Sequence, residues 1–299
     1  MESRPDLLSA QIFATPKVPA WARLRGEIQR DVDAAYVAGA ALNSLDNLVR
    51  TEPSWAGVWR QRLALKAAAA ATRLLGRKEE EGALRDAHFF RAPGDDPGPA
   101  GNLLLAWRRL ASRSTSLDEE AVRPVAEQFD VRWDDRLTEV VANAEDLAGS
   151  PRPAPLAAAE LATEFYQARP DAELLALWLA DALLAKKLHW PVPVPLLLGQ
   201  VNSSTFKTGE ARRRVRPGGE GWGRAVLAAY AQAAAEACDL GAELAGRATH
   251  LTGVAPKLRS KGAGQVVKLL LEDDAVPSSR SGAHLTDRSA RRLFERLGD

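Results

Sequence analysis

Apolar residues recur in this chain at steps of three and four positions over long stretches, which is the spacing of one helix face. Ala, Leu, Arg and Glu dominate the composition, and runs of β-branched residues that alternate with polar ones are nearly absent. We therefore predict an all-α fold, a multi-helix bundle. The clearest stripe, from Trp21 to Arg50, is formed by Leu24, Ile28, Val32, Ala35, Leu42, Leu45 and Val49.

The same spacing predicts helices along most of the remaining chain. The helix over 171–188 contains LLALWLADALLA and is apolar on most sides, so we expect it to be the central buried helix. Trp55 and Trp59 are four residues apart and are expected to anchor the core. Prolines in 190–199, WPVPVPLLLG, favour an extended path. The other predicted helices are 55–76, 79–89, 101–112, 134–147, 157–168, 222–251 and 262–272.

Breaks in the helical pattern suggest the domain organisation. We expect an N-terminal arm over 1–20 and a helical domain over 21–253, with a possible internal boundary at SPRPAP, residues 150–155. Residues 254–299 are expected to form a small helix-turn-helix unit. It would be winged-helix-like with a truncated wing, because the chain stops at Gly298-Asp299, where a wing would continue into a hairpin.

The last predicted helix, 286–297, is basic and amphipathic. As a recognition helix it would direct its arginines toward the phosphates or base edges of duplex DNA. Short basic helices also close helical bundles without touching DNA, and that alternative stays open. The candidate nucleic-acid-binding residues of this helix are Arg288, Arg291, Arg292 and Arg296.

A second basic cluster precedes the long helix predicted over 222–251. It lies in a polar segment, 202–223, that we expect to be an exposed loop. The alternatives are a solvated surface and phosphate contact, and no interleaved aromatic residues are present to stack on bases. The cluster consists of Arg212, Arg213, Arg214 and Arg216, with Lys207 nearby.

Bulk composition limits the classes of function. The net charge is +1 and apolar residues make up 46%, so a core can form and no global charge attracts nucleic acid or membrane. Cys238 is the single cysteine and lies in an Ala-rich helical run, which indicates a core residue in a reducing compartment. No signal peptide or membrane-spanning stretch is evident, so we expect a cytoplasmic protein without membrane contact.

No intact catalytic motif is present. The four histidines lie in no HExxH arrangement and no Cys/His cluster, and GxSxG and phosphate-loop motifs are missing. Asp95-Asp96 sits in a Pro/Gly-rich loop, where turn formation is the simplest interpretation. GGEGWG, residues 218–223, is interpreted as a flexible turn. We therefore assign no catalytic, metal-binding or cofactor-binding residue and expect no cofactor.

Several stretches resemble a family of bacterial proteins of unknown function, DUF1403. These are WAGVWRQRLALKAAAAATRLLGR with EEGALRDA, then PGDDPGPAG, LADALLAKKLHWPVPVPLL and LTDRSARRLFERL. Together they touch most of the chain from about residue 40 onward. The resemblance implies no established activity.

The layout of a long helix followed by a terminal helix-turn-helix also resembles Fic-type proteins. Fic enzymes transfer AMP with a His that is followed by an acidic residue and a Gly-rich anion-binding turn. His189 is the residue that stands in the corresponding place, but WPVPVPLLL follows it without carboxylate, glycine or arginine. Transition-state charge would therefore be unsupported there, and His189 suits a structural place at a helix end.

Three hypotheses about function follow. The first is a non-enzymatic regulator or accessory protein that binds duplex DNA. The second is a degenerate Fic-related protein or enzyme that binds a nucleotide around His189, Asp181 and Asp95. The third is a helical scaffold that binds a protein partner.

Overall fold

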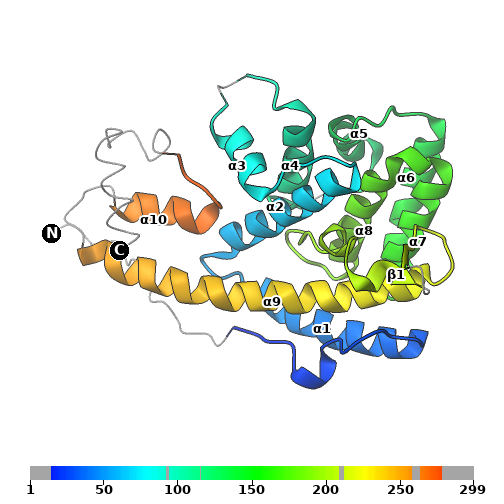
Figure 1. Ribbon diagram of the computed structural model, residues 1–299, viewed down its shortest axis with the longest axis horizontal. Coiled ribbons are helices and arrows are strands. Elements are labelled where there is room, and N and C mark those ends of the chain that lie inside the picture. The colour runs from blue at the N-terminus through cyan, green and yellow to red at the C-terminus, as the bar shows by residue number, and fades with distance from the viewer. Residues whose placement is uncertain (1–14, 92–93, 115, 209–211, 258–262, 278–299) are drawn as a thin grey trace.

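The computed structural model describes residues 15–91, 94–114, 116–208, 212–257 and 263–277. Within these ranges the fold is all-α, apart from a ribbon of two very short strands (Figure 1). None of the described helices is both long enough and apolar enough to cross a membrane. The α-helices are α1 (Asp31–Thr51), α2 (Ala56–Leu74), α3 (Glu81–Phe89), α4 (Gly98–Leu110), α5 (Glu119–Gln128), α6 (Asp135–Gly149), α7 (Ala154–Ala168), α8 (Glu173–Lys187), α9 (Trp222–Val254) and α10 (Ala263–Glu272).

Helix α9 runs along most of the molecule, and the other elements pack around it (Figure 1). It has 33 residues and is therefore about 50 Å long. Helix α1 lies alongside it, and both contact faces are rich in alanine, so the helix axes can approach closely. At Gly241 the approach is so close that a Cβ atom would lie 2.9 Å from Leu48 Cδ2.

The remaining helices form a second layer on the other side of α9 (Figure 1). Helices α7 and α8 pack against each other, and α2 packs against α4. Helix α8 is buried on nearly all sides, as its apolar sequence predicted. Trp55, Trp59 and Cys238 are also buried, which confirms their interpretation as core residues.

A buried carboxylate holds the proline-rich segment after α8 against the core. Asp181 of α8 is fully buried, and its carboxylate accepts hydrogen bonds from the backbone N–H groups of Leu196 (2.8 Å) and Leu197 (3.2 Å). Burial raises the pKa of Asp181 to about 7, while these N–H groups and the nearby Tyr230 hydroxyl oppose the rise. Asp181 thus provides an acceptor for two buried backbone N–H groups in a segment whose prolines prevent a regular helix.

The first predicted helix begins ten residues later than expected. Residues Ala20–Ala22 form a single 3₁₀ turn, and the chain then runs without regular structure to Asp31. Gly26 adopts a φ of 82°, a left-handed conformation that interrupts any helix. The apolar spacing of Leu24 and Ile28 therefore reflects packing of an arm, residues 15–30, against the core.

Helix α9 continues to Val254, across the expected boundary between the helical domain and the C-terminal unit. The next helix, α10, packs on α2, where a Cβ at Gly57 would lie 2.7 Å from the Glu272 carbonyl oxygen. At its end, Arg108 donates two hydrogen bonds to Asp273 (2.9 and 2.7 Å), and Asp274 pairs with Arg62. The predicted final helix 286–297 lies outside the described residues, so the helix-turn-helix stays a prediction.

Candidate functional site

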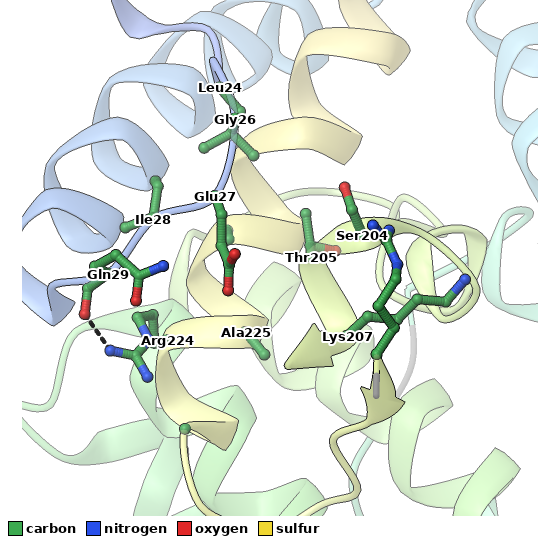
Figure 2. A pocket seen from close by; sticks show the side chains of 13 residues that line it. Leu24, Gly26, Glu27, Ile28, Gln29, Ser204, Thr205, Lys207, Arg224 and Ala225 are labelled. Atoms are coloured by element: carbon green, nitrogen blue, oxygen red, sulfur yellow. Dashed lines mark hydrogen bonds between the residues drawn. The ribbon is translucent and has the colours of Figure 1, made fainter. Parts of the chain in front are cut away.

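A cleft of about 480 Å³ opens between the arm, residues 204–207 together with Arg212, and the first turns of α9 (Figure 2). Three stretches that are far apart in the sequence meet here. Its lining is mainly polar and includes three cationic side chains and one carboxylate. The lining residues are Leu24, Gly26, Glu27, Ile28, Gln29, Ser204, Thr205, Lys207, Arg212, Gly221, Arg224, Ala225 and Ala228.

The arm is tied to α9 on both sides of the cleft. Arg23 donates two hydrogen bonds to the Asp239 carboxylate, at 2.8 and 2.6 Å. The hydrogen bond from Arg23 lowers the pKa of Asp239 below its ordinary value. Further along, Arg224 donates to the backbone carbonyl of Gln29 and lies 3.7 Å from Asp31 (Figure 2). The arm therefore crosses the open side of α9 as a strap fixed at two points.

The opposite wall is a two-stranded antiparallel ribbon, β1 (Lys207–Thr208) with β2 (Arg213–Arg214). Lys207 is paired in register with Arg214, and the Val215 N–H donates to the Phe206 carbonyl at 2.8 Å. Phe206 is buried, with its ring centroid 5.5 Å from that of Trp222 in the first turn of α9. This aromatic contact fixes the ribbon beside the start of α9, and so places Lys207 on the cleft.

The floor of the cleft is the N-terminal end of α9. Gly221 precedes the helix with a φ of 74°, and no side chain caps the first turn. The Trp222 indole N–H donates to the Ala159 carbonyl of α7 at 2.9 Å, which anchors this end in the core. An uncapped helix N-terminus carries partial positive charge, which adds to the field of the neighbouring cations.

The balance of charge in the cleft favours an anion. Arg224 is engaged by Gln29 and Asp31, whereas the side chains of Lys207 and Arg212 have no hydrogen-bond or ion-pair partner among the described residues. Glu27 is the carboxylate of the lining and lies at its centre in Figure 2. Because three cations outnumber the single carboxylate among the described lining residues, the site is suited to phosphate oxygens.

The structure separates the four arginines of the basic cluster into two pairs. Arg212 lines the cleft and Arg213 is exposed next to it. Arg214 instead donates to Glu173 of α8 (2.9 Å), and Arg216 donates to the Tyr166 hydroxyl (3.3 Å). The second pair is therefore engaged in contacts that hold the ribbon to α7 and α8. Arg288, Arg291, Arg292 and Arg296 lie outside the described residues.

The residues of the nucleotide hypothesis do not share one cavity. His189 is exposed just beyond α8 and lines a cleft of about 390 Å³ with Lys186, Ser114 and Ser116. Neither Asp181 nor Asp95 lines that cleft. The Asp181 carboxylate faces the core.

Asp96 follows Asp95 in the Pro/Gly-rich loop, and its carboxylate accepts a hydrogen bond from the Gly98 N–H (2.9 Å). This contact agrees with a turn-forming role for the pair Asp95-Asp96. In the part of the chain that the structure describes, no group of three His, Cys, Asp or Glu side chains is placed to hold a metal ion.

Sequence reasoning identified Arg212 and Lys207 but missed the other walls of the cleft. Glu27 and Gln29 fell inside a predicted helix, and Arg224 fell in the first turn of another. Gly26 was the available signal, because a glycine in the middle of a short amphipathic stripe indicates a break in the helix. The meeting of the arm with the ribbon depends on the tertiary contacts of Arg23 and Phe206, which no local pattern encodes.

Comparison with known proteins identifies one family. A family model described as "Protein of unknown function (DUF1403)" matches residues 6–299, essentially the whole chain. No curated protein and no solved structure matches. The likeness to Fic-type proteins receives no support from these comparisons.

Proposed function

The chain belongs to the DUF1403 family, and we propose that it is a non-enzymatic accessory protein that binds duplex DNA through phosphate contacts. The observation that carries this proposal is that the charged side chains of Lys207 and Arg212 face the cleft and have no partner among the described residues. Arg213, exposed on the same ribbon, extends the positive surface beyond the cleft. A protein with this role must be in the compartment that contains the DNA, and the sequence predicts a cytoplasmic location, which agrees with this requirement.

The composition of the cleft favours contact with the phosphate backbone of DNA over recognition of its bases. No aromatic side chain is among the residues that line it, so bases would have no surface to stack on. Phosphate contacts position a protein on the duplex without reading its sequence. Since the whole chain is nearly neutral, attraction to DNA must come from this local cluster and be strongest at low salt.

Fluorescence anisotropy with a labelled duplex, measured at several salt concentrations, tests the proposal. The triple variant Lys207→Ala, Arg212→Ala and Arg213→Ala should bind more weakly. The slope of log affinity against log salt should fall by roughly two to three, because each phosphate contact contributes about 0.9. The matched control removes three exposed arginines that are not among the residues lining the cleft: Arg73→Ala, Arg132→Ala and Arg136→Ala.

Glu27 provides a second, opposite test. Its carboxylate repels phosphate, so Glu27→Gln should strengthen binding at low salt, whereas loss of a structural contact would weaken it. The proposal is wrong if the wild-type protein does not bind the duplex at low salt, or if both triple variants weaken binding equally. A separate variant with alanine at Arg288, Arg291, Arg292 and Arg296 tests the predicted terminal helix by the same assay.

A further inference from the structure

The size of the cleft beside the first turns of α9 limits which part of a DNA molecule can enter it. Its volume of about 480 Å³ is that of a cube with an edge of about 8 Å, which is narrower than the major groove of B-DNA, about 12 Å wide. Clefts in this range of volume hold small ligands. A continuous duplex can therefore lie across the mouth of the cleft, whereas only a small group or the end of a strand can enter it.

The walls of the cleft are held in place by contacts outside it. The arm wall lies between two attachments to α9, because Arg23 pairs with Asp239 before the lining residues and Arg224 donates to the carbonyl at their end. The ribbon wall is fixed by the buried ring of Phe206. The cleft is therefore preformed, and a ligand has to fit its dimensions.

The charge of the lining matches a phosphate group with two negative charges. Three cationic side chains and the Glu27 carboxylate give the described lining residues a net charge of +2. A phosphodiester inside a strand carries one negative charge. A phosphomonoester carries about −1.5 to −2 at pH 7 and presents three acceptor oxygens. The lining therefore balances the charge of a terminal phosphate better than that of an internal one.

Neutral donors in the same cleft supplement the cations. The hydroxyl groups of Ser204 and Thr205 belong to lining residues, and the first turn of α9 adds backbone N–H groups that no side chain caps. Gly221 keeps this end of the cleft open, because a Cβ atom there would lie 3.2 Å from Arg224 Nη2. A phosphate with three free oxygens can use more of these donors than one with two.

Arg212 has a backbone conformation that indicates a role for its side chain. Its φ is 46°, in the left-handed region that favours glycine. Residues with side chains adopt this conformation at a cost in stability, and they collect at ligand-binding sites. The side chain of Arg212 lines the cleft and has no partner among the described residues. An anion bound in the cleft accounts for an arginine at this position.

We propose that the cleft binds a phosphomonoester, and that its source is the terminal phosphate of a DNA end. Lys207 and Arg212 contact the terminal phosphate inside the cleft, while Arg213, exposed on the ribbon, contacts the adjoining duplex. This inference rests on the proposed function, since it names the part of DNA that the cleft selects. A free nucleotide presents the same phosphate group, so the experiment includes one.

Fluorescence anisotropy with three duplexes of one sequence tests the proposal: one has 5′-phosphates, one has 3′-phosphates and one has only terminal hydroxyls. A phosphorylated duplex should bind roughly tenfold more tightly than the hydroxyl duplex, as one added charge-assisted hydrogen bond would give. Arg212→Ala should remove most of this preference. Arg213→Ala is the matched control, because it removes the same charge one residue away, outside the described lining. It should weaken binding to all three duplexes alike and keep the preference.

Competition with deoxyadenosine 5′-monophosphate at constant ionic strength identifies the source of the phosphate. The nucleotide should reduce binding of the phosphorylated duplex more than binding of the hydroxyl duplex, because it competes only inside the cleft. Equal binding of all three duplexes overturns the proposal and leaves the DNA-binding function standing, and so does an equal loss of preference in Arg212→Ala and Arg213→Ala. Calorimetric binding of the nucleotide without binding of any duplex overturns both the DNA end and the DNA-binding function.

Discussion

Asp181 makes a quantitative prediction about the stability of the fold. The perturbation is Asp181→Asn, which keeps an oxygen that can accept from the Leu196 and Leu197 N–H groups but removes the titration. In the wild type, burial raises the pKa of this carboxyl from 3.8 to about 7. At a pH between these two pKa values, the Asp181 carboxyl holds a proton in the native protein and releases it in the unfolded chain.

The sign and size of the effect follow from linkage. A carboxyl whose pKa is raised in the native state contributes most to stability below its unfolded pKa, and this contribution is lost as the pH rises through the native pKa. Each pH unit corresponds to about 1.4 kcal/mol, so Asp181 lowers the free energy of unfolding by about 4 kcal/mol from about pH 4 to pH 7. Tyr230, which faces Asp181, does not titrate in this window, because burial raises its pKa well above its ordinary value.

Urea unfolding of both proteins across this pH range measures the effect. Ion-paired carboxylates such as Asp171 and Asp239 have lowered pKa values and give an opposite pH dependence, but they are the same in both proteins. The difference in unfolding free energy, wild type minus Asp181→Asn, should therefore fall as the pH rises and level off above about pH 7. Parallel pH profiles for the two proteins would refute the reasoning.

Two further predictions concern packing. Gly57→Ala should lower the free energy of unfolding by about 1–3 kcal/mol, because its Cβ would lie 2.7 Å from the Glu272 carbonyl oxygen and α10 would have to move. Gly246→Ala, on the open side of α9, should raise the free energy of unfolding by about 1 kcal/mol. Thermal unfolding of each variant beside the wild type measures both effects. Cys238 should not react with a thiol reagent at pH 8 until the protein is unfolded, since burial raises its pKa to about 12, and rapid modification of the native protein would contradict this.

The helical architecture could be predicted because it depends on local properties. The sequence of helix α8 is apolar on most sides, and the helix is buried on most sides. Trp55 and Trp59 are four residues apart, and both are buried in the core. The start of α1 could not be placed in this way. Leu24 and Ile28 satisfy helical spacing while they pack from an irregular arm, since burial requires only that an apolar side chain reach the core.

The sequence also could not predict which arginines of the basic cluster would face the cleft, because their partners come from distant parts of the chain. Arg212 and Arg214 are two residues apart and have the same chemistry, yet one faces an open cleft and the other pairs with Glu173. The difference depends on Glu173, which lies about forty residues earlier and is placed beside the ribbon by the packing of α8. A charge run in a sequence indicates where cations are concentrated, and the fold decides which of them keep a free surface.

The arm contributes both to the cleft and to packing against α1, and this decides how the DNA-binding proposal must be tested. Glu27 and Gln29 line the cleft, while Trp21, a few residues earlier, stacks on the open face of α1. The bond between Arg23 and Asp239 holds both halves of the arm against α9. A substitution at Arg23 would therefore disturb DNA binding and the packing of the whole arm together, and its effect could not be assigned to phosphate contact. The ribbon residue Arg213 is exposed and lies outside the arm, so a change at this position tests phosphate contact without disturbing the arm.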